Sequence, residues 1–196
     1  MTQLRRDSFR SSAMLFFSLL LILAFTGSAF ANSREKPQPP TPDSSNYETW
    51  LTREVRHELV MLPFYSVFDN LQYQAEGTKV TLLGQVSRPV LKGDAEAAVK
   101  HIEGVEAVDN QIEVLPTSFG DDRIRRAEYR AIYSFPNLRM YSLRSVPPIH
   151  IIVNSGHVTL EGSVATEADK DAAGIRANAI PDVFSVVNNL RVDKGQ

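Results

Sequence analysis

The chain has 196 residues, of which 43% are hydrophobic and 22% charged, and its formal net charge is −2. These proportions are those of a globular protein, which argues against wholesale disorder and against a polytopic membrane protein. The absence of cysteine excludes disulfides, thiolate metal sites, a cysteine nucleophile and a lipid on an N-terminal cysteine. The acidic balance argues against nucleic acid as a partner.

Residues 1–31 have the three parts of an export signal in order. Three arginines precede an apolar run, Ala13–Phe25, and small residues ending in an A-x-A site at Ala29–Ala31 follow it. The run is too short to span a bilayer comfortably, so we expect cleavage after Ala31; retention as an anchor is the alternative. Cleavage leaves 18 basic and 22 acidic side chains, a balance of −4.

Residues 32–46 hold four prolines. Proline fixes φ and lacks a backbone donor, so we expect an extended, disordered leader, with a spacer favoured over a docking motif.

An internal repeat organises the remainder. Val80–Val114 and Val158–Val192 align without a gap at an offset of 78, with twelve of 35 positions identical. The shared positions are mostly apolar, as a common core requires. We therefore divide the chain into a first repeat, residues 47–116, and a second repeat, residues 117–196.

Each repeat is predicted to hold a hairpin, a helix and a last strand. Residues 71–75 and 149–153 alternate apolar and polar side chains, turn residues follow, and 80–86 and 158–164 alternate again. The helices are expected at 92–102 and 167–180, and the last strands at 105–114 and 183–192.

A further helix is predicted before each hairpin. One apolar face comprises Leu51, Val55, Leu59 and Leu62 behind Asn46 as the N-cap, and the other comprises Ile124, Ala127, Ala131 and Ile132 behind Asp121 and Asp122. The fold class is therefore α+β: two α-β-β-α-β units, each a three-stranded mixed sheet covered by two helices. Because such small cores are marginal, we expect the units to touch.

Repeated glycines and asparagines are interpreted structurally. Gly84 and Gly162 fall within strands, where we expect a helix backbone to cross closely. Gly104 is expected to end a helix in the left-handed conformation. Asn110 and Asn188 are expected to pin a neighbouring loop.

The pattern V-T-L-x-G-x-V, the alanine-rich helix after it and G-V-x-x-V-x-N-x-I-x-V at Gly104–Val114 resemble tandem BON-domain proteins, of the osmotically inducible periplasmic protein Y group. The second repeat departs from this pattern at Pro181, Asp182 and Leu190. The resemblance implies a periplasmic, non-enzymatic module that binds phospholipid surfaces or envelope proteins, in outer-membrane maintenance or osmotic stress.

No catalytic constellation is found in the sequence. The four histidines form no metal-ligand spacing, and nucleophile-elbow, P-loop and dinucleotide motifs are absent. We therefore expect no enzyme activity, no metal and no cofactor; an envelope hydrolase is the enzyme-class alternative.

Charge separates the repeats. The first has 6 basic and 11 acidic side chains, a balance of −5, and the second has 10 and 9, a balance of +1. Arg123, Arg126 and Arg130 follow helical spacing as one stripe, interpreted either as a solvated face or as a site for anionic lipid.

The second repeat also carries an insertion at 135–144, in which apolar residues alternate with Arg139 and Arg144. It either covers the interface between the repeats or inserts Leu138, Met140 or Tyr141 into a bilayer surface while the arginines meet phosphates. The sequence thus predicts a lipid site on the second repeat, with envelope proteins as alternative partners and no transmembrane span after cleavage.

Overall fold

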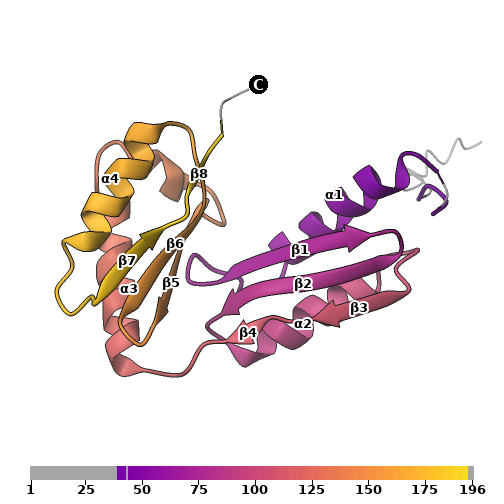
Figure 1. Ribbon diagram of the computed structural model, residues 1–196, viewed down its shortest axis with the longest axis horizontal. Helices are drawn as coiled ribbons and strands as arrows, with labels where there is room; N and C mark the ends of the chain where they lie inside the picture. The colour runs from indigo at the N-terminus through magenta and orange to yellow at the C-terminus, as the bar shows by residue number, and fades with distance from the viewer. Residues whose placement is uncertain (1–38, 43, 194–196) are drawn as a thin grey trace, which may run out of the picture. The chain divides into compact units, whose positions relative to one another are not determined.

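The computed structural model describes residues 39–42 and 44–193, which contain two copies of one arrangement (Figure 1). The predicted signal, residues 1–31, lies outside the described residues, as does most of the predicted leader. The elements of the first repeat are α1 (Tyr47–Val60), β1 (Asn70–Glu76), β2 (Lys79–Val86), α2 (Pro89–Lys100), β3 (Ala107–Asn110) and β4 (Glu113–Val114). Those of the second are α3 (Phe119–Tyr133), the 3₁₀ helix η1 (Arg139–Leu143), β5 (Ile149–Asn154), β6 (His157–Val164), α4 (Glu167–Asn178), β7 (Ser185–Asn188) and β8 (Arg191–Val192).

Each repeat forms one mixed sheet, as predicted. In the first, β1 runs antiparallel to β2, and β3 and β4 both run parallel to β2. In the second, β5, β6, β7 and β8 repeat this pairing. The α+β fold with two repeated units is therefore confirmed, and the third strand of each sheet is interrupted rather than continuous.

An asparagine side chain accounts for each interruption. The Asn110 carboxamide oxygen accepts from the backbone N–H of Ile112, and its nitrogen donates to the Lys92 carbonyl at 2.8 Å. Asn188 makes the equivalent bonds to Leu190 and Lys170 in the second repeat. These asparagines pin the backbone of α2 and α4, where the sequence predicted a neighbouring loop.

The two strand glycines have a different cause from the one predicted. Gly84 and Gly162 have φ of 106° and 108°. A Cβ there would lie 2.0 Å from the carbonyl oxygen of Asn70, the first residue of β1, or of Pro148, which directly precedes β5. The expected helix crossing is therefore wrong. Gly104 does have a positive φ of 85° after α2, and Asp182 takes that conformation in the second repeat.

The helix starts also differ in part from expectation. Asn46 precedes α1, but its side chain makes no capping bond. The cap of α3 is Ser118, whose hydroxyl accepts from the Asp121 N–H. The Asp121 carboxylate instead accepts from the backbone N–H groups of Ser155 and Gly156 in the β5–β6 turn.

Each repeat has its own apolar core. The helix faces are confirmed where Leu51, Val55 and Leu59 are buried in the first repeat, and Ile124 and Ile132 in the second. Leu62, Ala127 and Ala131 are half-buried. The equivalent residues Leu82 and Leu160 occupy the two cores and are fully buried.

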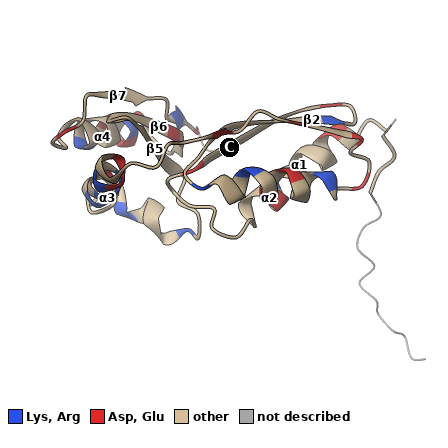
Figure 2. Cartoon of the chain, turned by 90° about the horizontal axis from the view of Figure 1, so that it is seen from below, with Lys and Arg blue, Asp and Glu red and all other residues tan. Residues whose placement is uncertain are grey.

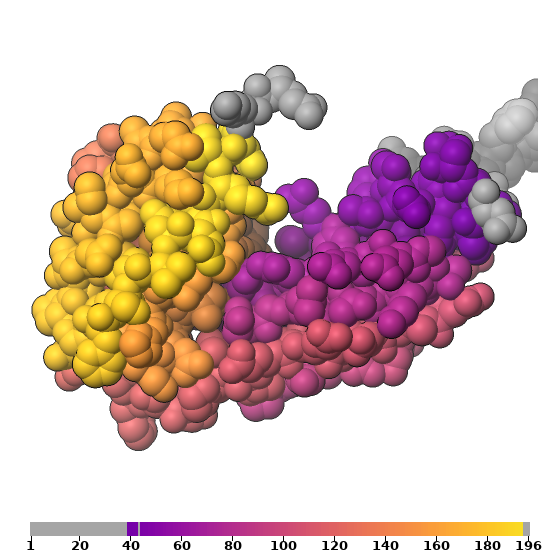
Figure 3. Space-filling model, viewed as in Figure 1, coloured from indigo at the N-terminus to yellow at the C-terminus, as the bar shows by residue number. Residues whose placement is uncertain are grey.

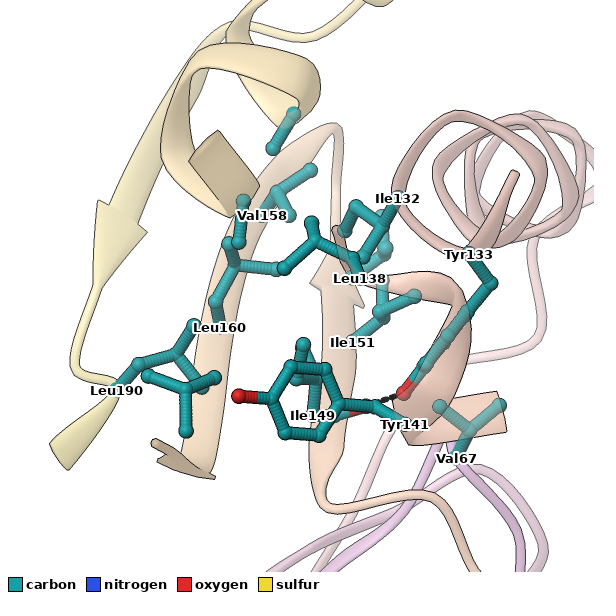
Figure 4. Close-up of a cluster of buried hydrophobic side chains, with 14 of the residues drawn as sticks. Val67, Ile132, Tyr133, Leu138, Tyr141, Ile149, Ile151, Val158, Leu160 and Leu190 are labelled. Carbon is teal, nitrogen blue, oxygen red and sulfur yellow. Dashed lines mark hydrogen bonds between the residues drawn. The ribbon is translucent and has the colours of Figure 1, made fainter. Parts of the chain in front are cut away.

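The connection between α1 and β1 packs against the second core. Asp69 is fully buried and accepts hydrogen bonds from the N–H and hydroxyl of both Ser66 and Ser87. The turn that Asp69 holds places Val67 in the apolar cluster of the second repeat (Figure 4). The Val67 carbonyl accepts from the Ile151 N–H at 2.8 Å.

Candidate membrane-binding surface

The predicted arginine stripe lies on α3. Arg123, Arg126 and Arg130 are all exposed, on the side of the helix away from the buried Ile124 and Ile132. Figure 2 shows basic residues along α3 and in the chain that follows it. A spacing of three and four residues brings the three guanidinium groups onto one helix face, as the sequence predicted.

Arg123 differs from the other two arginines because it has an acidic partner. Its guanidinium donates to the Asp182 carboxylate at 2.8 Å, and both side chains are largely exposed. This pair is worth little to stability, but it neutralises one charge of the stripe. The stripe therefore offers Arg126 and Arg130 as its main anion contacts.

Arg126 and Arg130 border a hollow with an apolar lining. The hollow measures about 260 Å³ and is lined by these two arginines, Tyr129 and Phe68. The rings of Phe68 and Tyr129 meet edge to face, with their centroids 6.3 Å apart. The ring centroids of Tyr129 and Tyr133 are 4.9 Å apart. An apolar hollow beside two cations suits a ligand that joins an anionic group to hydrocarbon.

The insertion 135–144 is only partly exposed, because η1 has an inner and an outer face. Leu138 and Tyr141 are buried, at 0% and 7% exposed, and both belong to the core shown in Figure 4. The Tyr141 hydroxyl donates to Asp169 and accepts from the Ala165 N–H. The prediction that Leu138 or Tyr141 inserts into a bilayer is therefore wrong, since both side chains hold η1 to the second repeat.

Met140 and Leu143 form the outer face of η1. They are 62% and 84% exposed, and Arg139 and Arg144 beside them are also exposed. A 3₁₀ helix has three residues per turn, so residues 138 and 141 share one face while 140 and 143 share another. The outer face thus combines two large apolar side chains with two arginines. Leu143 was absent from the predicted site.

The histidines are dispersed. His57, His101 and His157 are exposed, and the His150 ring stacks on Tyr65 at 5.7 Å. Burial lowers the pKa of His150. Within residues 39–42 and 44–193, no cluster of three or more metal-binding side chains occurs. In the same residues, no helix is long and apolar enough to cross a membrane.

A comparison with known protein families agrees with a duplicated module. The BON domain profile matches residues 47–116 and 138–194, which cover both hairpins and the helix and strands after them. The chain belongs to the BON domain family, with two copies of the domain. No curated protein matches the chain.

Solved structures add little to this assignment. The chain is similar to the C-terminal domain of CdsD, a structural protein of the type III secretion system of Chlamydia trachomatis. That match has 13% identity and a TM-score of 0.26, and it covers 73% of this chain and 97% of the other. A second CdsD structure matches at 13% identity and a TM-score of 0.25, covering 74% and 93%. At these scores the likeness carries no argument about function.

Proposed function

We propose that the chain is an exported, non-enzymatic module whose second repeat associates reversibly with anionic phospholipid surfaces. The observation that supports this most directly is the hollow between Arg126 and Arg130, whose remaining lining is the aromatic pair Phe68 and Tyr129. Phosphate attracts the two guanidinium groups, and the glycerol and upper acyl region of a lipid suits the aromatic wall.

The expected affinity is modest. An arginine near an anionic surface gains about 1 kcal/mol, within a Debye length of about 8–10 Å. Arg126 and Arg130 together then supply only weak binding. Insertion of Met140 and Leu143 adds about 0.8 kcal/mol for each buried CH₂ group, with Arg139 and Arg144 placed to meet phosphates.

The charge difference between the repeats favours one repeat over the other as the membrane-contacting part. The first repeat has a balance of −5, which an anionic surface repels, whereas the second has +1. We therefore expect contact through the second repeat. The proposed setting is the periplasm, in envelope maintenance or osmotic stress, with the chain grouped with the osmotically inducible periplasmic protein Y proteins.

Flotation of the purified chain with liposomes tests this proposal. We expect flotation with vesicles containing phosphatidylglycerol or cardiolipin, and none with pure phosphatidylcholine vesicles. Raising the salt concentration should release the protein, because exposed charges are screened. If the chain stays at the bottom with anionic vesicles at low salt, the lipid proposal is wrong and the alternative, a protein-interaction or chaperone-like module for envelope proteins, takes its place.

A further inference from the structure

Among the described residues, the two edge strands of the second sheet, β5 and β7, differ in whether their outward backbone groups have hydrogen-bond partners. On the outer side of β5, the Tyr133 hydroxyl donates to the Ile149 carbonyl, the Ile151 N–H donates to Val67, and Arg125 donates to the Val153 carbonyl. These contacts occupy three of the outward backbone groups along that strand. β7 ends the other side of the sheet, and no strand within the described part of the chain pairs with its outer side.

The free side of β7 offers backbone groups to a further strand. The Asn189 N–H donates inward to the Leu160 carbonyl, and alternation along the strand then turns the backbone groups of Val186 and Asn188 outward. An edge of this kind pairs readily with another strand unless charged side chains guard it.

In the first repeat the edge strand itself carries charge, whereas in the second β7 carries none and the charge of Asp171 lies on the flanking helix α4. Glu106 lies directly before β3, and Asp109 lies within it. The ion pair of Glu96 with Lys100 lies on α2 nearby. The positions equivalent to Glu106, Asp109 and Glu96 in the second repeat are Phe184, Val187 and Gly174. The same fold thus carries one charged edge and one apolar edge.

The apolar edge is open to solvent. Phe184 is 76% exposed, Val187 50%, and Ile175 on the flanking helix 69%. A groove of about 590 Å³ runs between α4 and β7, lined by Gly174, Ile175 and Asn188 and, at α4, by the charged Asp171. Figure 3 shows this orange and yellow surface uncovered. Apolar side chains gathered at a free strand edge mark an interaction surface.

We propose that this edge pairs with the same edge of a second copy of the chain, β7 against β7 in antiparallel order about a two-fold axis. Such pairing sets Ser185 of one copy opposite Val187 of the other, and it joins the two second-repeat sheets into one. A second copy fits because β7 carries no charge that would meet its own image. The corresponding pairing of β3 would bring Asp109 close to a second Asp109.

Sedimentation velocity of the purified chain, without lipid, tests the proposal. We expect the mean mass to rise from monomer toward dimer as the protein concentration increases. Val187→Asp and Phe184→Glu give this edge the charges of the first repeat. Each should weaken dimerisation about tenfold or more, since like charges on paired strands repel. Val90→Asp is the control, because Val90 is also 50% exposed but lies on α2.

Site-specific crosslinking gives a second readout, because the natural chain has no cysteine. Val187→Cys treated with a short bismaleimide should form covalent dimers, whereas Val90→Cys should not. A monomer at every concentration would overturn the proposal and leave the edge to a foreign strand. A dimer unaffected by Val187→Asp and Phe184→Glu, or equal crosslinking at both cysteines, would also overturn it. None of these outcomes depends on vesicle binding.

Discussion

Arg125 and Glu128 lie one turn apart on the buried face of α3, yet no hydrogen bond or ion pair joins them among the described residues. Arg125 donates to the Asp122 carboxylate at 2.6 Å and to the Val153 carbonyl at 2.7 Å. Both Glu128 carboxylate oxygens are buried without a hydrogen-bond partner in the described structure. Burial raises the pKa of Glu128 from 4.5 to about 8.

This carboxyl group predicts a pH-dependent stability. Between pH about 4.5 and 8, Glu128 is protonated in the folded protein and ionised in the unfolded chain. The folded state then binds more protons, so the free energy of unfolding falls as pH rises through this window. Glu128→Gln should flatten this dependence and stabilise the protein above pH 8 by about 1–3 kcal/mol.

Urea unfolding across this pH range checks the prediction. Glu161→Gln is a suitable control, because Glu161 lies half-buried on β6 and the Asn189 amide donates to its carboxylate. A parallel pH profile for wild type and Glu128→Gln would show that the buried carboxyl group is not the cause.

We predict that adding a single methyl group at Gly162 lowers the free energy of unfolding considerably. Gly162→Ala places a Cβ 2.0 Å from the Pro148 carbonyl oxygen at a φ of 108°. Backbone strain alone should lower the free energy of unfolding by about 1–3 kcal/mol. Gly93→Ala provides the contrast, since Gly93 is exposed on α2, its added Cβ meets nothing within 4 Å, and alanine favours a helix by about 1 kcal/mol. Equal thermal midpoints for the two variants would contradict this explanation.

The sequence predicted the fold because its signals are local. Alternation around Val80 and Leu82, and again around Val158 and Leu160, marks the strands, and the repeat shows that both copies share them. The role of Asp69 was missed, since its four donors come from Ser66 and Ser87 on separate segments. Only the folded chain brings these groups together.

The candidate site was predicted only in part, because some of its features are local in the sequence and others depend on contacts between distant segments. Helical spacing identified the exposed arginines of α3, but no local signal separates Leu138 and Tyr141 from Met140 and Leu143. Which face of η1 turns inward depends on its contacts with the second core. The aromatic hollow depends on Phe68, which is distant in sequence from Arg126.

The outer face of η1 predicts an apolar contribution to membrane binding. Met140→Ser with Leu143→Ser should weaken binding to anionic vesicles about tenfold or more, because the inserted hydrocarbon is lost. Circular dichroism should remain that of the wild type, as both side chains are exposed. Met61→Ser, which changes a methionine 66% exposed in the first repeat, should leave binding unchanged. If all three proteins bind equally, η1 does not enter the bilayer.

Charge reversal at the hollow tests the lipid-binding proposal most directly. Cosedimentation with anionic vesicles at low salt should compare wild type, Arg126→Glu with Arg130→Glu, and Arg53→Glu with Arg56→Glu. Arg53 and Arg56 are a matched exposed pair on α1 of the acidic repeat. We expect the change on α3 to abolish cosedimentation and the change on α1 to leave it nearly intact, with both proteins folded. Full binding by the Arg126 and Arg130 variant would contradict a phospholipid site on α3.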